Sequence, residues 1–217
     1  MDTEKLKRVS TMISKEAFSL DFQLRNIFSA AEIEAGEITP QAAIVDIDEL
    51  IQSQIQYFQF KAIQNHVTID FHQGQGRHFK TDGKLVQVIV MNLLSNAVEF
   101  SPANKKVSIR CRIESNNHLI LEVQDFGPGI SIEDRKHIFE RFKQMESGST
   151  KTHSGHGLGL SIVKEFTDAL RGKIDIDSEA GKQTTMIITL PEFELSRLPE
   201  GFSFDGQEVL FGDEEIL

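Results

Sequence analysis

The chain has 217 residues and a formal net charge of −10 at pH 7. Its length suits one domain with an appendage, and its 39% of hydrophobic residues can form a core. The negative charge argues against nucleic acid as a partner, because binding a phosphate backbone requires a basic surface. Cys111 is the only cysteine, so we expect no disulfide within the chain and a cytoplasmic protein. No apolar run in the sequence is long enough to span a bilayer.

The first 36 residues predict one long helix. Their apolar residues recur in steps of three or four, as in a coiled-coil seam. Gly36 and Pro40 are expected to end the helix. The helix could pack on its own domain, but a seam of this length favours a partner, and we expect a homodimer through residues 1–36. The seam residues are Leu6, Val9, Ile13, Ala17, Leu20, Leu24, Ile27 and Ala31.

Residues 45–191 predict a domain of mixed helices and strands. A helix begins near Asp46, which precedes Glu49 by three residues as in a capping box. The stretch "VTIDFH" alternates as a half-buried strand and leads into a turn at "QGQG". Asp82 is then expected to begin a helix through "GKLVQVIVMNLLSNAVEF".

The second half of this domain adds strands and two further helices. "KVSIRCRIE" and "HLILEVQD" predict a hairpin, and "KIDIDS" and "TTMIITL" predict two closing strands. One short helix is expected from Ser131 to about Phe142, and another from about Leu158 to Leu170. This order predicts an α+β fold with a mixed sheet whose helices cover one face. The acidic residues 192–217 are expected to form a tail or a linker.

Two asparagines are the first candidate ligand-binding residues. Asn92 and Asn96 are four residues apart on a predicted helix, so their amides share one face. Burying amides is costly unless something satisfies them. A magnesium ion with phosphate oxygens would do so, because hard cations take oxygen ligands. Alternatively, both amides cap a neighbouring loop.

The stretch "QDFGPGI" places a carboxylate at the end of a strand. Asp125 is followed by Gly127 and Gly129. Its carboxylate could accept a hydrogen bond from an exocyclic amine, although an ordinary turn would have the same sequence.

Two further stretches follow in the chain. In "FERFKQ", Phe139 and Phe142 are three residues apart on the predicted short helix, and core packing is the expected role. In "GHGLGLSIVKEF", Gly155, Gly157 and Gly159 come immediately before a helix. A glycine-rich turn at a helix N-terminus is a common arrangement for holding phosphate.

The order of these stretches resembles the ATP-binding domain of sensor histidine kinases. "QVIVMNLLSNAVEFS" is similar to the asparagine box of that family, "DFGPGI" to its first glycine box, "FERF" to its phenylalanine box and "GHGLGLSIVKEF" to its second glycine box. "GKQTTMIITLP" resembles the end of the domain, so the resemblance covers roughly residues 45–191. It implies a two-layer α/β sandwich of the Bergerat type that binds ATP and Mg²⁺.

The resemblance also implies roles for individual residues. Asn96 would coordinate Mg²⁺, and Asn92 would assist through the metal or a water molecule. Asp125 would accept a hydrogen bond from the adenine amino group. A threonine of the closing strand would help Asp125, and both Thr184 and Thr185 are candidates. The remaining expected nucleotide contacts are Gly127, Gly129, Ile130, Gly155, Gly157, Leu158 and Gly159.

One departure from the family pattern concerns charge near the phosphates. The asparagine box usually has a basic residue where this chain has Glu99. A glutamate there would repel phosphate unless it turns outward or a cation compensates it. Residues 143–154 would form a lid over ATP, and Lys151 or His153 of this lid could supply that cation.

A second departure concerns the acceptor of the phosphoryl group. These kinases phosphorylate their own histidine on the first of two dimerising helices, but no histidine precedes His66 here. "AEIEAGEITP" resembles the end of the second helix, so the chain is expected to begin after the acceptor. A less favoured alignment sets Phe22 in the place of the histidine. The implied reaction transfers the γ-phosphoryl group of ATP to a histidine outside this chain, with a response regulator receiver domain as a further partner.

Two other functions remain open. A non-catalytic nucleotide-binding module would use ATP only to set a conformation, and Glu99 supports it best. An ATPase of the gyrase or heat-shock chaperone type would need a general-base glutamate one turn before the magnesium asparagine. This chain has Asn92 at that position, which disfavours a hydrolase.

Overall fold

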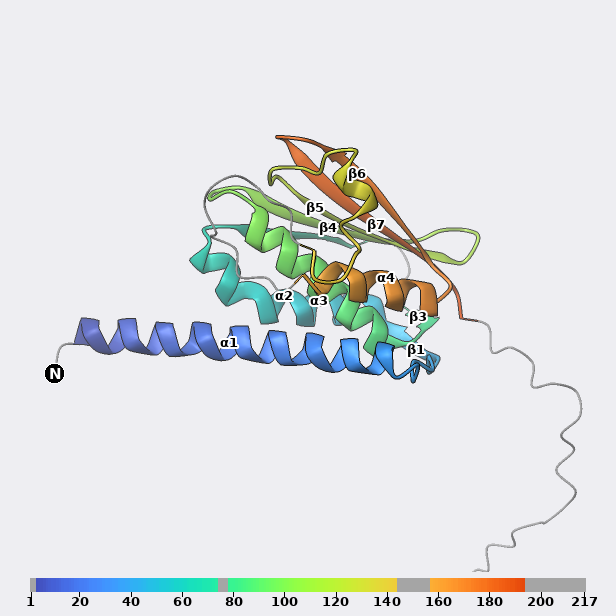
Figure 1. Cartoon of the computed structure of the whole chain (residues 1–217), viewed down its shortest axis with the longest axis horizontal. Coiled ribbons are helices and arrows are strands. Elements are labelled where there is room, and N and C mark those ends of the chain that lie inside the picture. Colours follow the sequence, from blue (N-terminus) through green and yellow to red (C-terminus); the bar gives the residue numbers. More distant parts are fainter. Residues whose placement is uncertain (1–2, 74–77, 144–156, 194–217) are drawn as a thin grey trace, which may run out of the picture.

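A computed structural model describes residues 3–73, 78–143 and 157–193. Figure 1 shows a sheet, a layer of helices α2, α3 and α4 on one of its faces, and the long helix α1 beneath that layer. In chain order the elements are α1 (Thr3–Glu34), β1 (Ala43–Asp46), α2 (Ile47–Gln64), β2 (Thr68–Gln73), β3 (His78–Thr81), α3 (Gly83–Phe100), β4 (Lys106–Ile113), β5 (His118–Asp125), the 3₁₀ turn η1 (Asp134–Lys136), α4 (Gly159–Ala169), β6 (Lys173–Glu179) and β7 (Gln183–Pro191).

The main sheet is mixed, as the sequence predicts. Its five strands lie in the order β2-β4-β5-β7-β6. Strands β2 and β4 pair in parallel, and the remaining pairs are antiparallel. The α+β prediction, with helices over one face of a mixed sheet, is therefore confirmed.

A second sheet of two short strands was not predicted. Strands β1 and β3 pair antiparallel, with Ala43 opposite Thr81 and Asp46 opposite His78. Each strand has only four residues. A segment of that length carries too few positions for an alternating pattern, and its pairing partner lies far away along the chain.

Helices α2 and α3 begin where their capping residues predict. The Asp46 carboxylate accepts a hydrogen bond from the Glu49 backbone N–H at 3.0 Å, and the Asp82 carboxylate accepts one from the Leu85 N–H at 3.1 Å. Helix α3 is buried on most of its surface, between the sheet and its neighbouring helices. Its almost continuous apolar sequence is the pattern of a helix that is buried over most of its surface.

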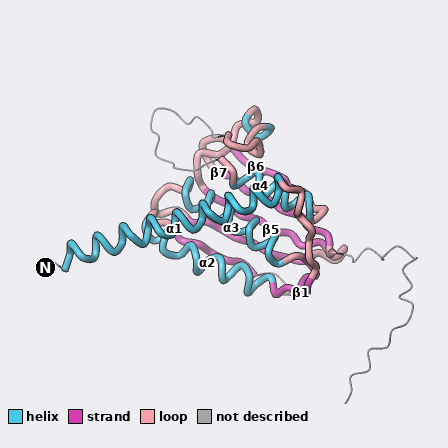
Figure 2. Tube along the Cα trace, turned by 60° about the horizontal axis from the view of Figure 1, so that its bottom comes forward, coloured by secondary structure: helices cyan, strands magenta, loops and turns pink. Residues whose placement is uncertain are grey.

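Helix α1 ends as predicted. Gly36 has a φ of +66°, and the Glu37 N–H reaches back to the Glu32 carbonyl at 3.2 Å. This is the left-handed glycine cap that the sequence suggests. Figure 2 shows α1 crossing the layer of helices, and Figure 1 shows its N-terminal end extending beyond the domain.

Two opposite faces of α1 carry apolar residues. Phe18 and Phe22 pack edge-on against the ring of Phe58 in α2, with centroids 5.4 Å and 6.1 Å away. Leu20 and Leu24 of the predicted seam point the other way and are exposed, as are the seam residues of the N-terminal half. The helix therefore packs on its own domain through one face and leaves the seam open, so the dimer through that seam stays a prediction.

The helix predicted from Ser131 to Phe142 is wrong. The Ser131 hydroxyl does accept a hydrogen bond from the Asp134 N–H at 3.1 Å, but only the 3₁₀ turn η1 follows. Phe142 has a φ of +62°, and its N–H donates to the Gly157 carbonyl at 2.9 Å. A residue in this left-handed conformation cannot continue a right-handed helix.

The end of the domain extends slightly past β7. The Glu192 N–H donates to the Asn117 carbonyl and the Phe193 N–H donates to the Lys80 carbonyl, at 3.0 Å and 2.8 Å. The predicted tail beyond these two residues lies outside the described part of the chain. In the described ranges, no helix combines the length and the apolar content that crossing a membrane requires.

Candidate nucleotide-binding site

Asn92 lies at the centre of the candidate site and is only 1% exposed. Its Nδ2 donates to the Val88 carbonyl one turn earlier and to Oδ1 of Asn26 in α1, both at 3.0 Å. Its own Oδ1 is buried and has no hydrogen-bond partner among the described residues. A buried oxygen without a partner among the described residues is costly, so it is a candidate contact for a ligand. Asn96, one turn further along, is half-buried.

The N-terminus of α4 lies against this free oxygen. A Cβ built on Gly159 would come within 2.8 Å of Asn92 Oδ1, so only glycine allows the helix to approach so closely. Leu158 is the N-cap residue and contributes no side-chain cap, so within the described part of the chain no side chain caps the first backbone N–H groups of α4. Uncapped amides at a helix N-terminus are a ready site for phosphate.

The second glycine box is described only in part. Gly157 has a φ of +68°, and a Cβ there would meet the backbone of Phe142 at 2.7 Å. This glycine therefore joins the phenylalanine box to the start of α4. Gly155 and most of the predicted lid, with Lys151 and His153, lie outside the described residues.

Asp125 ends β5 and is half-buried. Its Oδ1 accepts a hydrogen bond from the Gly127 N–H at 2.8 Å. Burial raises the pKa of the Asp125 carboxyl to about 6, although the Gly127 bond acts in the opposite direction. A Cβ on Gly127 would lie 2.8 Å from that same oxygen, so the turn also depends on glycine. The carboxylate keeps a second oxygen that could accept from a ligand amine.

The two threonines of the closing strand have different cross-strand partners. Thr184 is the cross-strand partner of Asp125, whereas Thr185 is the partner of Gln124. Directly opposite residues share a face of the sheet, so Thr184 lies on the side of the carboxylate. The Thr184 hydroxyl also lies 3.0 Å from the Ser178 hydroxyl, which accepts a hydrogen bond from the Ile130 N–H.

The turn after Asp125 is fixed by packing on β6. Gly129 has a φ of +68°, and a Cβ there would collide with the backbone carbonyl of Glu179. Ile130 is buried beside this turn. These contacts hold the first glycine box against the sheet.

The charge of Glu99 is compensated within the described structure. Its carboxylate accepts a hydrogen bond from the Lys61 ammonium of α2 at 3.0 Å, and the same ammonium lies 3.3 Å from the Ser95 hydroxyl. Both charged side chains are 23% exposed. The sequence pattern indicated candidate cations only in the lid. No local pattern links Lys61 to Glu99, because the two residues lie on different helices.

The phenylalanine box connects the site to other helices. Phe139 is half-buried and packs against the core, which confirms the expectation for this residue. Core packing is wrong for Phe142, which is 71% exposed because its backbone turns away at positive φ. Between them, Arg141 forms an ion pair with Glu34 of α1 at 3.1 Å.

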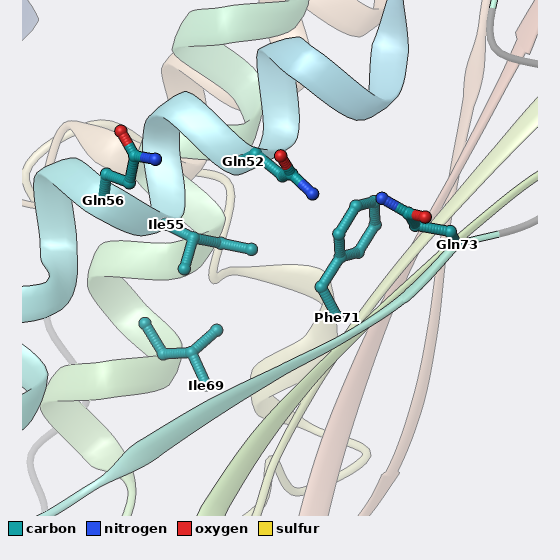
Figure 3. Close-up of a pocket in the computed structure, with 6 residues that line it drawn as sticks. All are labelled: Gln52, Ile55, Gln56, Ile69, Phe71 and Gln73. Carbon is teal, nitrogen blue, oxygen red and sulfur yellow. The ribbon is translucent and has the colours of Figure 1, made fainter.

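A groove elsewhere in the molecule contains none of the predicted site residues. It measures about 270 Å³ and lies between α2 and β2 (Figure 3). Its lining is apolar or amide and carries no charge to meet a phosphate. The lining residues are Gln52, Ile55, Gln56, Ile69, Phe71 and Gln73.

The donor atoms at Asn92 and Asn96 suit magnesium better than a transition metal. Among the described residues, no group of three or more histidine, cysteine, aspartate or glutamate side chains could hold a metal. Amide oxygens are hard ligands, and Mg²⁺ usually takes one or two protein ligands together with substrate phosphates. The free Oδ1 of Asn92 fits that requirement.

Together, these elements define the nucleotide-binding fold of an ATPase-like domain. Residues 81–194, more than half of the chain, match the model of the histidine kinase-, DNA gyrase B- and HSP90-like ATPases. The chain belongs to this family.

Similar proteins indicate which branch of this ATPase family the chain resembles. The chain is 30% identical over 180 residues to the sensor histidine kinase TmoS of Ectopseudomonas mendocina, covering 83% of this chain and 18% of TmoS. It is 27% identical over 192 residues to the sensor-like histidine kinase SenX3 of Mycolicibacterium smegmatis, covering 88% and 50%. The full-length crystal structure of ShkA with AMPPNP shares the fold, with a TM-score of 0.71, 24% identity and coverage of 86% and 38%. The matched segment is the ATP-binding catalytic domain of sensor histidine kinases, and the chain spans half or less of each of these proteins.

Proposed function

We propose that this chain is the catalytic ATP-binding part of a sensor histidine kinase. It would transfer the γ-phosphoryl group of ATP to a histidine Nε2 on a segment outside this chain. The observation that carries the proposal is the buried Oδ1 of Asn92, which has no hydrogen-bond partner among the described residues and lies beside the N-terminus of α4. An oxygen ligand and a row of amides on one side of the fold are what a metal-bound triphosphate needs.

Each predicted residue has a role in this proposal. Asn96 and Asn92 would hold Mg²⁺, which when bound neutralises phosphate charge. The amides at Gly159 would receive phosphate oxygens, and Asp125 would accept from the adenine amine. The neighbouring contacts would come from Gly127, Gly129, Ile130, Gly155, Gly157 and Leu158.

The acceptor histidine is proposed to come from a separate segment. The five described histidines are His66, His72, His78, His118 and His137, and none of them lies within a described α-helix. Phosphoryl transfer relies on alignment, so a histidine on the sheet or in a turn would be a poor acceptor. A neutral imidazole is itself nucleophilic, and the ATP domain would only have to present an aligned phosphate.

We extend the proposal to partners and compartment. The exposed seam of α1 would pair with a second copy, and a response regulator receiver domain would take the phosphoryl group onward. The single buried Cys111 and the use of ATP favour the cytoplasm.

The alternative is a nucleotide-binding module without catalysis. Its main support is Glu99, which would repel phosphate. The ion pair between Glu99 and Lys61 weakens that support, because the carboxylate charge is neutralised where it lies. A hydrolase is disfavoured as well, since an amide at Asn92 cannot act as a general base for water.

Transfer to a supplied acceptor tests the proposal. The chain is incubated with γ-labelled ATP, alone and with a helical segment that carries the acceptor histidine of a related sensor kinase. We expect label only on the added segment, and this label should be lost in acid and stable in base. Asn96→Ala serves as the inactive control. Acid-labile label on the chain alone would place the acceptor within it, and ATP binding without any label would favour the non-catalytic module.

A further inference from the structure

We propose that Asn26 of α1 is a positioning residue for the nucleotide site. It would hold the Asn92 amide so that Oδ1 faces the N-terminus of α4. The inference rests on the proposed function, because it gives that free oxygen a role in binding Mg·ATP. Asn26 lies outside the segment that matches the ATPase family, on a helix that precedes it.

The hydrogen bonds leave only one orientation for the Asn92 amide. The Val88 carbonyl can only accept, so the amide group that faces it must be the Nδ2 side. Asn26 Oδ1 accepts the second N–H of the same nitrogen at 3.0 Å. With both N–H groups used, Oδ1 is the remaining polar atom, and it lies next to Gly159.

Burial makes the Asn26 contact hard to replace. Asn26 is 7% exposed and Asn92 is 1% exposed. Water therefore has little access to either side chain, and loss of the Asn26 acceptor would leave a buried N–H group unsatisfied. An amide with one bond in place of two can rotate more freely about its terminal torsion, which is intrinsically broad.

Contacts on both sides of Asn26 hold α1 in place. Before it, the Tyr57 hydroxyl donates to the Asp21 carboxylate at 2.6 Å. After it, Glu32 pairs with Lys84 at 2.9 Å and Glu34 pairs with Arg141 at 3.1 Å. Asn26 thus lies in the middle of a docked stretch of helix, and its position is fixed from both ends.

This arrangement couples the docking of α1 to the metal-binding oxygen. When α1 is docked, Asn92 Oδ1 is held toward α4. When α1 moves away, the amide loses one acceptor and its orientation is no longer fixed. Coupling of this kind is reciprocal, so Mg·ATP should in turn favour the docked position of α1.

The test compares three variants of the full chain. Asn26→Leu removes the acceptor at similar volume, and Asn26→Asp keeps an acceptor oxygen. Gln23→Leu is the matched control, because the Gln23 amide contacts only Ser19 on the same helix in the hydrogen bonds of the described residues. Affinity is measured by calorimetry for ATP with Mg²⁺ and for ATP in EDTA, and the unfolding temperature is measured for each variant.

We expect Asn26→Leu to weaken Mg·ATP binding by roughly 10-fold, the effect of one lost buried hydrogen bond. Binding of ATP in EDTA should change by less than about 2-fold, because positioning acts through the metal oxygen. Gln23→Leu should bind Mg·ATP like the wild type. Asn26→Asp still accepts the Asn92 N–H, so it should keep the Asn92 amide in its wild-type orientation. The side-chain NH₂ signal of Asn92 should exchange slowly with solvent in the wild type and fast in Asn26→Leu.

Two results would overturn the positioning role. One is an unchanged Mg·ATP affinity in Asn26→Leu, and the other is an equal loss with and without Mg²⁺, which would indicate general destabilisation. If Asn26→Leu does not fold, Asn26→Ser gives the same comparison, since its short side chain cannot reach Asn92. A wild-type chain that does not bind Mg·ATP at all would instead overturn the proposed function, and this proposal with it.

Discussion

Helices α1 and α3 both place an asparagine in the candidate site, but the two helices are held in the fold by different contacts. Helix α3 is enclosed by the sheet and its neighbours, and its position follows from an almost continuous apolar sequence. Helix α1 has apolar residues on two opposite faces and uses only one of them against the domain. The Asn26–Asn92 hydrogen bond is where the two helices meet.

The difference separates a fixed part of the site from an adjustable one. Asn92, Asn96 and the Asp125 turn are held by a buried core, and moving them would cost much of the stability of the fold. The docked face of α1 is held by a few rings and ion pairs, most of them partly exposed. Variants in the core site should therefore weaken binding strongly, and variants on the outer face of α1 should leave it intact.

Asn96→Ala should have the largest effect. The variant removes one of the two amide oxygens proposed to hold Mg²⁺ and leaves only that of Asn92, so we expect Mg·ATP affinity to fall more than about 100-fold. Calorimetry measures the loss, and Asn116→Ala, in the exposed β4–β5 turn, is the matched control. An Asn96→Ala variant that binds like the wild type would remove Asn96 from the metal site.

Asp125→Asn should come second, with a loss of roughly 10- to 100-fold for ATP. The amide keeps an acceptor for Gly127 but offers the adenine amine a donor where an acceptor is needed. Discrimination against GTP should shrink together with ATP affinity. Competition between ATP and GTP measures this, and equal competition in both proteins would mean that Asp125 does not contact the base.

The same residue predicts a pH dependence. The pKa of Asp125 is raised to about 6 by burial, above its value of about 3.9 in an unfolded chain. The folded state therefore holds this proton more tightly, and the contribution of Asp125 to stability falls as pH rises from about 4 to 6. ATP binding should show the opposite trend and weaken below about pH 6, because the protonated carboxyl is a poorer acceptor.

The pH titration needs a control for the phosphates of the nucleotide. Those groups titrate in the same range for any protein, so the ratio of wild-type to Asp125→Asn affinity isolates the carboxyl. We expect this ratio to shrink as pH falls from 7.5 to 5. A constant ratio would show that the protonation state of Asp125 has no part in binding.

Lys61→Met should have a smaller effect. It leaves the Glu99 carboxylate uncompensated near the phosphates, and we expect ATP affinity to fall about 3- to 10-fold. A double variant that combines Lys61→Met with Glu99→Gln should regain the wild-type ATP affinity, since the repelling charge is then gone. Lys106→Met, which breaks an exposed pair with Asp70 on the sheet, is the control. Failure of the double variant to recover would assign Lys61 a role that does not depend on Glu99.

The smallest effect on nucleotide affinity is expected for a substitution in the exposed seam of α1. Leu24→Glu places a charge on the exposed face of α1, opposite Phe22. We expect it to convert a dimer into a monomer in sedimentation experiments, because an apolar seam excludes an unpaired charge. Mg·ATP affinity should stay within about 2-fold, since the docked face is unchanged. A wild type that is already monomeric at high micromolar concentration would contradict the dimer.

The sequence predicted the core of the site better than its borders. The caps at Asp46 and Asp82 and the apolar pattern of α3 are local signals, and the structure confirms them. The contacts of Lys61 and Asn26 could not be predicted, because they join helices that are far apart in the chain. No single-helix pattern reports such a contact.

The misplaced elements have a similar explanation. The Ser131 cap is present, but the left-handed backbone at Phe142 and its bond to Gly157 prevent the expected helix. Strands β1 and β3 depend on pairing with each other, and each is too short to show an alternating pattern in the sequence. In both cases a distant partner determines the local structure.

Backbone NMR of the labelled chain during titration with Mg·AMPPNP tests the central claim most directly. We expect the largest shift changes at Asn92, Asn96 and Gly127 and at the start of α4, with smaller changes at Asn26. Signals from the groove between α2 and β2, such as Phe71, should stay in place. Changes concentrated at that groove, with the asparagines unaffected, would contradict the account.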